Sequence, residues 1–226
     1  MSTGSSEKVI DLYLLRHGHS TANNAGILAG RDNTVHLTAK GLDQAAQVVK
    51  PLAELSLTEI YTSPITRCRE TLQPLSKAIA LKPITDKRLI EMDYGSWSGK
   101  KLSNLATKPL WREIQSRPST VRFPEGESFL EMVARISDFF DFINAASKRS
   151  RALLICSHGD VIKAMVAHAL GLHIDQFQRL VIDPASISHI RLLKNGLTLV
   201  KSNDTSHLAP SKKSKVDRAI LGGGAG

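Results

Sequence analysis

The triplet Arg16-His17-Gly18 contains the residue types needed for chemistry on a phosphate group. Arginine offers five donors in a planar fork that matches phosphate oxygens, and a neighbouring glycine lets the backbone approach a ligand closely. The imidazole can attack phosphorus, and the resulting phosphohistidine divides one difficult displacement into two easier steps. A triplet alone recurs by chance, and a core histidine beside a surface arginine is the simpler explanation until partners are found elsewhere in the chain.

A second arginine, Arg67, follows a short apolar run that ends at Ser63-Pro64. Proline is favoured in the first turn of a helix and serine is a common N-cap, so the sequence predicts a helix that opens at Pro64 with Ser63 as its cap. Arg67 then falls about one turn into that helix, where the free backbone N–H groups and the helix dipole also attract an anion. We expect a second phosphate clamp, with an arginine on a solvated helix face as the alternative.

A second His-Gly pair, His158-Gly159, ends the apolar run of residues 152–157 and precedes a segment rich in aliphatic residues. If one histidine attacks phosphorus, the other, when protonated, can join the arginines in stabilising the charge that develops on the transferring group. A satisfied core histidine explains His158 taken alone. Two strands that each end in His-Gly favour the catalytic interpretation.

The elements that must position these residues are strands. The run of residues 9–15 is interrupted only by Asp11 and Tyr13, which is typical of a central parallel strand buried on both faces. The carboxyl ends of parallel strands meet at one edge of a sheet, and ligands bind there in open α/β folds. We therefore expect His17 and His158 to share that edge.

The chain resembles the histidine phosphatase superfamily, the phosphoglycerate mutase-like proteins, over most of residues 9–201. The stretches SPITRCRET, FPEGES and SHGDVIKAMVAHALGLH carry a closer resemblance to an actinobacterial subgroup of phosphomutases and phosphatases. The resemblance implies that His17 is the phosphorylated nucleophile, and that Arg16, Arg67 and His158 form the phosphate pocket. It also implies phosphate contacts by Asn23 and Gly159.

A phosphate ester also needs a proton for its leaving group, which a positioned carboxylic acid can supply. Residues 88–99 form a glycine-containing loop that offers two acids, Glu91 and Asp93, and the residues themselves do not choose between them. The resemblance implies Glu91, as general acid and then as the base that activates water. That role requires a pKa raised by burial or by neighbouring carboxylates.

The neighbour of Glu91 bears on the choice between a phosphatase and a mutase. In the family, glycolytic mutases carry an arginine directly after the catalytic glutamate and a later Arg-Arg stretch that grips the phosphoglycerate. This chain has Met92 at that position and lacks the later stretch. We expect a phosphatase without a cofactor, with a phosphoglycerate mutase or other phosphomutase as the alternative; only a mutase would need 2,3-bisphosphoglycerate as a primer. A non-catalytic phosphate-binding scaffold is a minority alternative, because the nucleophile, the acid and the phosphate-binding residues are all present.

Other classes fit the sequence less well. His17-Gly18-His19 has the spacing of a metal-binding pair, but Arg16 places a permanent cation beside it and no carboxylate-rich ligand set follows, so we expect no metal site. Neither Cys68 nor Cys156 is followed by the arginine loop of a thiol phosphatase. The formal net charge of +9 and two Lys/Arg clusters accompany no nucleic-acid motif, and they also suit a small phosphorylated metabolite as the partner.

Residues that read the organic part of a substrate are harder to identify. Glu127 and Ser128 match a family loop over the pocket, yet a surface acid and a helix cap explain them without any function. Arg31, in the polar loop of residues 19–37, could grip an anionic substrate or face water. We hold these three as substrate-side candidates.

The alternation of short apolar runs with helical periods favours an α/β fold. The resemblance implies three layers, α/β/α, with a mostly parallel central sheet. We expect a helix capped by Thr38 with Leu42, Ala45, Val49 and Leu52 on its apolar stripe, kinked or ended by Pro51. Ser128 to Glu131 form a capping box that opens a long amphipathic helix. A hairpin of residues 186–193 and 197–201 should add an antiparallel edge.

The domain organisation is simple. We expect one catalytic domain over residues 1–203 and a flexible Lys/Ser/Gly-rich tail over residues 204–226. No apolar run approaches the roughly 20 residues that span a bilayer, and the N-terminus lacks a secretory signal pattern, so we expect a cytoplasmic enzyme without a membrane partner. The oligomeric state stays open, and a homo-oligomer is one option.

Overall fold

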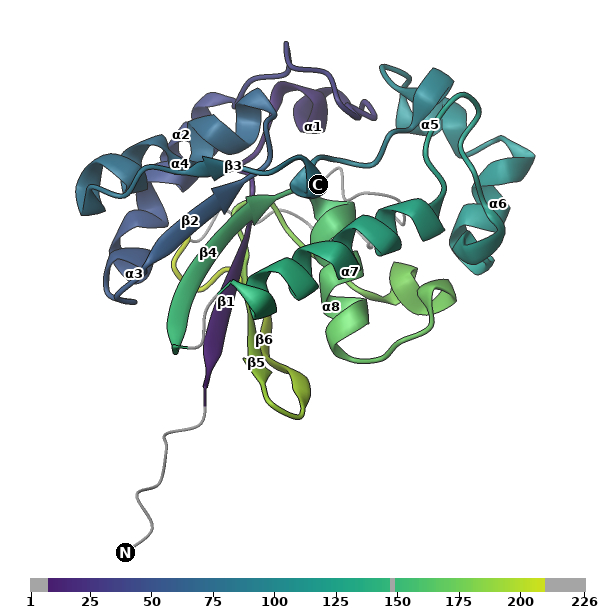
Figure 1. Ribbon diagram of the computed structural model, residues 1–226. Coiled ribbons are helices and arrows are strands. Elements are labelled where there is room, and N and C mark those ends of the chain that lie inside the picture. The colour runs from purple at the N-terminus through teal and green to yellow at the C-terminus, as the bar shows by residue number, and fades with distance from the viewer. Residues whose placement is uncertain (1–7, 147–148, 210–226) are drawn as a thin grey trace, which may run out of the picture.

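The computed structural model describes residues 8–146 and 149–209 as three layers around one central sheet (Figure 1). The strands lie in the order β3-β2-β4-β1-β5-β6. β3, β2, β4 and β1 run parallel, β5 is antiparallel to β1, and β6 is antiparallel to β5. The strand bounds are β1 Ile10–Arg16, β2 Glu59–Thr62, β3 Ile84–Thr85, β4 Arg151–Ser157, β5 Ile187–Leu193 and β6 Gly196–Asp204. The predicted α/β fold, with its antiparallel edge hairpin, is confirmed.

Helices cover both faces of the sheet (Figure 1). α2, α3 and α4 lie on one face; α7 and α8 lie on the other, and α5 and α6 extend that layer. The longer helices are α2 Ala39–Gln47, α4 Thr66–Ile79, α6 Pro109–Ser116, α7 Phe129–Ala145 and α8 Gly159–Ala169. The shorter ones are α1 Thr21–Ala25, α3 Val49–Ala53 and α5 Leu102–Leu105, with 3₁₀ helices η1 Lys87–Leu89, η2 Gly95–Trp97, η3 Pro118–Thr120 and η4 Ile174–Arg179.

Side chains of β1 alternate between the two faces of the sheet and pack into both hydrophobic cores. Leu12 and Leu14 join the core beneath α7 and α8, whereas Leu15 joins the core beneath α2, α3 and α4. Tyr13 packs against the second core and is half-buried, with its ring stacked on His189 of β5. Successive residues of a strand point to opposite faces, so this strand is buried on both sides as predicted.

Register brings the two His-Gly pairs together. β1 and β4 are parallel and pair Arg16 with Ser157, so His17 and His158 both follow at the carboxyl edge of the sheet. The backbone N–H of His17 donates to the carbonyl of Ser157 at 3.0 Å, which ties the two strand ends. The expectation of a shared edge is confirmed.

Two of the predicted helix starts are confirmed. Thr38 accepts a hydrogen bond from the N–H of Gly41 at the start of α2, and Ser128 and Glu131 form a reciprocal capping box at the start of α7. The helix after Thr38 is interrupted at Val48, three residues before Pro51, because a proline ring clashes with the carbonyl four residues earlier. Leu42, predicted on the core stripe, is instead 55% exposed.

The predicted cap at Ser63 is wrong. α4 begins at Thr66, its N-cap residue is Ile65, and Ile65 makes no side-chain capping bond. The N–H of Thr66 is met by the side chain of Asn33, and the hydroxyl of Ser63 bonds His158. Arg67 is consequently the second residue of the helix instead of a residue one turn in.

The predicted boundary at residues 203/204 falls inside β6, which runs to Asp204. Leu208 packs against the core beneath α2, α3 and α4, and the N–H of Ala209 donates to Gln47. The rest of the predicted tail, residues 210–226, lies outside the described residues. In the part of the chain that is described, no helix is both long enough and apolar enough to cross a membrane.

Candidate active site

A cavity of about 370 Å³ opens at the carboxyl edge of β1. It is called the basic cavity here, and its lining includes Arg16, His17, Asn23, Arg67 and Glu91. β1 supplies Arg16 at its last residue, the following turn supplies His17, and α4 supplies Arg67 at its second residue. Five of the predicted site residues therefore border one cavity, although they come from four separate parts of the chain.

The turn that holds His17 is packed without spare room. The N–H of Gly18 donates to the hydroxyl of Thr71 at 2.9 Å, and a Cβ on Gly18 would lie 2.7 Å from the carbonyl oxygen of Gly41. A Cβ on Gly41 would in turn lie 2.1 Å from the carbonyl oxygen of His19. Glycine at both positions is what lets α2 press against the turn.

His17 is oriented by its own backbone. Its Nδ1 lies 2.8 Å from the carbonyl oxygen of Gly18, which can only accept, so Nδ1 carries the proton. Nε2 is therefore the nitrogen with a lone pair, and it accepts a hydrogen bond from Nε of Arg67 at 3.2 Å. Burial, aided by the charges of Arg67 and Arg16, holds the pKa of His17 well below its ordinary value. A neutral imidazole with an unprotonated Nε2 is the nucleophilic form.

The two arginines are held in place by carbonyl oxygens. Arg67, 1% exposed, donates to the carbonyls of Gly30 and Asp32 at 2.8 and 3.3 Å. Arg16, 2% exposed, donates to the carbonyl of Ile182 at 2.6 Å. A Cβ on Gly159 would lie 3.4 Å from the Arg16 guanidinium carbon, so the start of α8 lies flat against that group. These guanidinium groups are fixed before any anion arrives.

His158 lies beside the basic cavity and does not line it. Its ring is wholly buried, 5.3 Å from the ring of His17 between centroids. Nδ1 accepts from Arg67 at 3.0 Å, and Nε2 therefore donates to the hydroxyl of Ser63 at 2.7 Å. Burial and the charge of Arg67 hold the pKa of His158 well below its ordinary value. In this state His158 is neutral and orients Arg67, instead of carrying the positive charge that the sequence analysis considered.

Glu91 and Asp93 have different surroundings. Glu91 is 8% exposed, borders the basic cavity, and has Oε2 3.8 Å from Nδ1 of His158. Burial and the nearby charge of Asp160 raise the pKa of Glu91 to about 7. Asp93 does not line this cavity and pairs with Arg31 at 3.1 Å. Of the two acids, Glu91 lines the basic cavity together with His17, and Asp93 does not.

The substrate-side candidates are engaged with one another. Arg31 donates to the backbone carbonyl of Glu91 at 2.9 Å and pairs with Glu127 at 3.1 Å. Glu127 also pairs with Arg135 of α7 at 2.8 Å. Ser128 is the cap of α7. These residues brace the loop that carries Glu91, and the structure gives none of them a free group directed into the basic cavity.

Asn23 is partly occupied as well. Its Oδ1 accepts from the N–H and the hydroxyl of Ser20 at 3.0 and 2.8 Å, which closes a capping box at the start of α1. The amide still borders the basic cavity. Sequence reasoning gave Ser63 only a capping role, and it missed Tyr94 and Asp160. Asp160 directly follows His158-Gly159, but nothing in the sequence marked it as a buried residue.

The described residues contain no group of three or more His, Cys, Asp or Glu side chains that could hold a metal ion. The positive charge at the basic cavity comes from Arg16 and Arg67. Both cysteines are free and buried, Cys68 in α4 and Cys156 in β4.

Comparison with known proteins agrees with this geometry. The family model of the histidine phosphatase superfamily (branch 1) matches residues 12–205. The chain is 30% identical over 217 residues to a protein of Erwinia tasmaniensis named "Probable phosphoglycerate mutase GpmB", covering 93% of this chain and 100% of the relative. It is 29% identical to the "Putative phosphoserine phosphatase 2" of Hydrogenobacter thermophilus, over 87% of this chain and 96% of that protein. The solved structure of Bacillus stearothermophilus YhfR superposes with a TM-score of 0.81 at 26% identity, over 88% and 98% of the two chains.

Proposed function

The chain belongs to the histidine phosphatase superfamily, branch 1, and we propose that it hydrolyses phosphomonoesters of a small metabolite through a phosphohistidine on His17. Membership makes it an enzyme of the phosphatase and mutase class. One observation carries the finer proposal: the Nε2 lone pair of a neutral His17 and a carboxyl group of raised pKa on Glu91 border the same cavity.

The first chemical step forms a bond from Nε2 of His17 to phosphorus as the bond from phosphorus to the ester oxygen breaks. Glu91 donates its proton to the departing oxygen, which leaves as an alcohol. Arg16 and Arg67 stabilise the charge on the equatorial oxygens, and Asn23 and the N–H of Gly159 are further phosphate contacts. We expect His158 to act through Arg67, whose guanidinium it orients by accepting a hydrogen bond at Nδ1.

The second step consumes water. A water oxygen attacks phosphorus, the Glu91 carboxylate takes the proton of that water, and the bond from phosphorus to Nε2 breaks. Free phosphate leaves and both residues return to their starting states. A pKa of about 7 suits a group that must act as an acid and then as a base near neutral pH.

A phosphoglycerate mutase is the second candidate, because the relative from Erwinia is named as one. The residue after Glu91 argues against it. Met92 is apolar and wholly buried, whereas the mutases of the family carry an arginine there to grip the glycerate. Only a mutase would require 2,3-bisphosphoglycerate; a phosphatase needs no cofactor. The proposed partner is a small phosphorylated metabolite, with no nucleic acid, no metal and no membrane.

The test measures phosphate release from p-nitrophenyl phosphate and a panel of phosphorylated sugars, amines and glycerates with EDTA present, alongside a coupled mutase assay with and without 2,3-bisphosphoglycerate. We expect metal-independent phosphate release that is lost in His17→Ala, because no other described residue supplies an equivalent Nε2. The matched control is His173→Ala, since His173 is an exposed histidine that does not line the basic cavity.

Circular dichroism should show that both variants keep the parent fold. Turnover at the parent rate in His17→Ala would rule out a phosphohistidine intermediate on His17. Isomerisation that depends on the bisphosphate would make the enzyme a mutase, and silence in both assays would favour a non-catalytic scaffold.

A further inference from the structure

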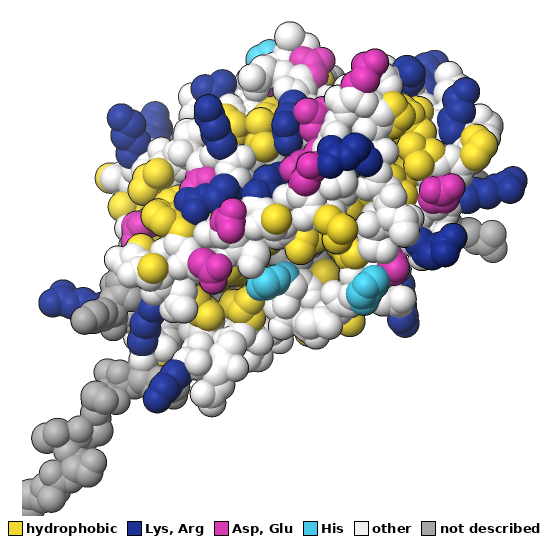
Figure 2. All heavy atoms as spheres, turned by 45° about the vertical axis from the view of Figure 1, so that its right-hand side comes forward, with side chains coloured by type: hydrophobic (Ala, Val, Ile, Leu, Met, Phe, Trp, Pro, Cys, Tyr) yellow, Lys and Arg dark blue, Asp and Glu magenta, His cyan; other side chains and the backbone are white. Residues whose placement is uncertain are grey.

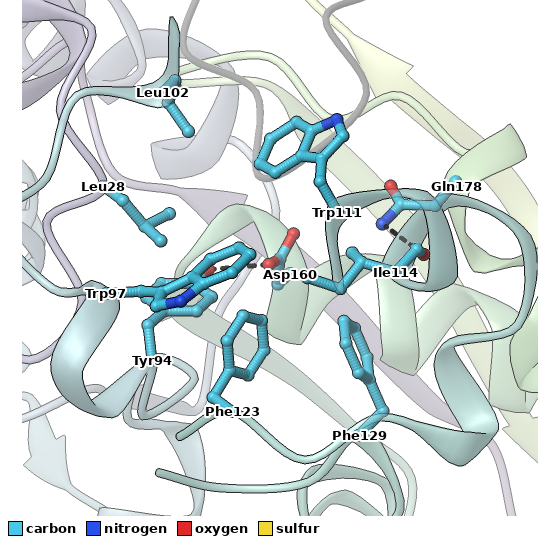
Figure 3. A pocket seen from close by; sticks show the side chains of 10 residues that line it. All are labelled: Leu28, Tyr94, Trp97, Leu102, Trp111, Ile114, Phe123, Phe129, Asp160 and Gln178. Carbon is cyan, nitrogen blue, oxygen red and sulfur yellow. Dashed lines mark hydrogen bonds between the residues drawn. The ribbon is translucent and has the colours of Figure 1, made fainter. Parts of the chain in front are cut away.

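The side chains drawn in Figure 3 line a second cavity, which adjoins the basic cavity. The two share three lining residues, Leu28, Tyr94 and Leu102. We call this second cavity the aromatic cavity, because its other lining residues are mostly aromatic or aliphatic. Those residues are Trp97, Trp111, Ile114, Phe123, Phe129, Asp160 and Gln178. Trp97 and Trp111 stack at 6.4 Å between ring centroids. The organic part of an ester whose phosphate lies against His17 would reach this space past Tyr94.

One lining residue, Asp160, carries a carboxylate among side chains that are mostly apolar. It is 4% exposed, and its Oδ2 accepts from the hydroxyl of Tyr94 at 2.7 Å. Its Oδ1 is buried and receives no hydrogen bond from the described part of the protein. Figure 3 shows the carboxylate among the wall side chains, with one oxygen tied to Tyr94 and the other turned away from it.

The charges of Lys163 and Arg16 act on Asp160, but the side-chain hydrogen bonds of the neighbouring Gln178 and Lys163 go to other groups. The amide of Gln178 donates to the carbonyl of Ile114 at 3.4 Å and accepts from the ammonium of Lys163 at 3.5 Å. Lys163 is itself 4% exposed and lies 5.2 Å from the centre of the Phe177 ring. A buried carboxylate oxygen without a donor is costly, so a donor brought by a ligand would bind it strongly.

We propose that the aromatic cavity binds the organic half of the substrate, and that this half is an aromatic or compact apolar group carrying an amine that donates to Oδ1 of Asp160. The proposal rests on the proposed function. Tryptophan rings attract a cation as well as an apolar surface, so the walls and the carboxylate select the same group. A glycerate carboxylate would meet the Asp160 carboxylate and be repelled.

The test compares two esters of nearly equal shape, tyramine O-phosphate and 4-propylphenyl phosphate, which differ by an ammonium in place of a methyl group. Their affinities are measured by titration calorimetry on His17→Ala protein, which binds without turnover. We expect the amine ester to bind at least about tenfold more tightly, because the propyl ester leaves Oδ1 without a donor. Adding Asp160→Asn, which removes the charge at constant shape, should bring the ratio to about one. Equal affinities in the His17→Ala protein would overturn the proposal.

A second variant pair keeps the test independent of the folding of the Asp160 variant. Trp111→Ala removes an aromatic wall, and Leu110→Ala on the same helix removes a side chain that does not line the cavity. We expect Trp111→Ala to weaken both aryl esters by about tenfold while inorganic phosphate binds within about twofold of the parent affinity, and Leu110→Ala to change neither. Unchanged aryl affinity in Trp111→Ala would show that the ring lies elsewhere and would overturn the proposal.

Hydrolysis of the two esters by the wild-type enzyme separates this inference from the proposed function. If the amine ester binds more tightly but neither ester is hydrolysed, the proposed phosphatase activity is wrong and the proposed amine-binding cavity stands. If both esters are hydrolysed without any preference for the amine, the phosphatase activity stands and the proposed role of Asp160 is wrong.

Discussion

At the scale of single residues, the proposed mechanism depends on two groups whose pKa values are shifted in the directions it requires. Burial and the two arginines keep His17 neutral, and burial with Asp160 keeps Glu91 protonated to about pH 7. A neutral nucleophile beside a protonated acid is the state required for the first chemical step. Both shifts come from the same dry, charged surroundings.

The role of Glu91 predicts how activity depends on pH and on the leaving group. As pH rises through about 7, Glu91 loses the proton that it donates in the first step, so kcat/KM for alkyl phosphates should fall. Glu91→Gln should lower kcat/KM for alkyl phosphates by about 10²- to 10⁴-fold and abolish this pH limb. The loss should be much smaller for p-nitrophenyl phosphate, whose leaving group departs without a proton.

Steady-state rates for both ester types across pH check this prediction, with Asp93→Asn as the control acid in the same loop. An equal loss for both esters would show that Glu91 does not protonate the leaving group.

At the scale of elements, the loops that carry His17 and Glu91 are held by close contacts between segments far apart in the chain. α2 presses on the turn of His17 through Gly41, and Arg31, Glu127 and Arg135 join the loop of Glu91 to α7. The positions of the proposed nucleophile and the proposed acid therefore depend on how these segments pack.

Gly41 provides a test of the packing at the turn. Glycine to alanine inside a helix ordinarily stabilises a protein by about 0.5–1 kcal/mol. Here the added Cβ would lie 2.1 Å from the carbonyl oxygen of His19, so α2 or the turn must move. We expect Gly41→Ala to lower the free energy of unfolding by about 1–3 kcal/mol and to reduce kcat/KM strongly. Denaturant unfolding measures the first effect and steady-state kinetics the second, with Lys40→Ala at an exposed neighbouring position as the control. A Gly41→Ala protein that is stabilised and fully active would show that the close contact between α2 and the turn does not exist.

Glu127 distinguishes bracing from substrate binding. Its carboxylate, 10% exposed, accepts from Arg31, Arg135 and the N–H of Asp93. Glu127→Gln removes the charge between two guanidinium groups, so we expect the loop of Glu91 to loosen and kcat/KM to fall by about tenfold for every ester alike. The exposed Glu125→Gln is the control. A loss confined to esters of one charge would instead place Glu127 in contact with the substrate.

At the scale of the whole molecule, the formal net charge is +9. On the face drawn in Figure 2, lysine and arginine side chains are spread among acidic ones and do not gather in a single patch. We expect the net positive charge to attract anionic substrates towards the molecule, where Arg16 and Arg67 of the basic cavity can bind them.

This field predicts that salt slows capture of the substrate. Screening shortens the range of the attraction to about 8 Å at physiological ionic strength, so kcat/KM for a phosphate dianion should fall several-fold between low and high salt, while kcat stays nearly constant. Stopped-time assays across a potassium chloride series check it, with sucrose at matched osmolality as the control. A kcat/KM that is independent of salt would show that steering contributes nothing.

Much of the fold and part of the site could be predicted from the sequence, because their signals are local. The apolar runs before Arg16-His17-Gly18 and before His158-Gly159 predicted parallel strands, and parallel strands place their carboxyl ends at one edge. The helix caps at Thr38 and Ser128 could also be predicted from the sequence, since a cap depends on residues three positions apart.

Tertiary structure alone decided how these residues are partnered and which of them are buried. Ser63 bonds His158 instead of capping a helix, Arg31 and Glu127 bind each other, and Asp160 lies inside an aromatic cavity. Each of these outcomes depends on distances between segments that are remote in sequence. A pKa such as that of Glu91 follows from burial and neighbouring charge, and both exist only once the layers have packed.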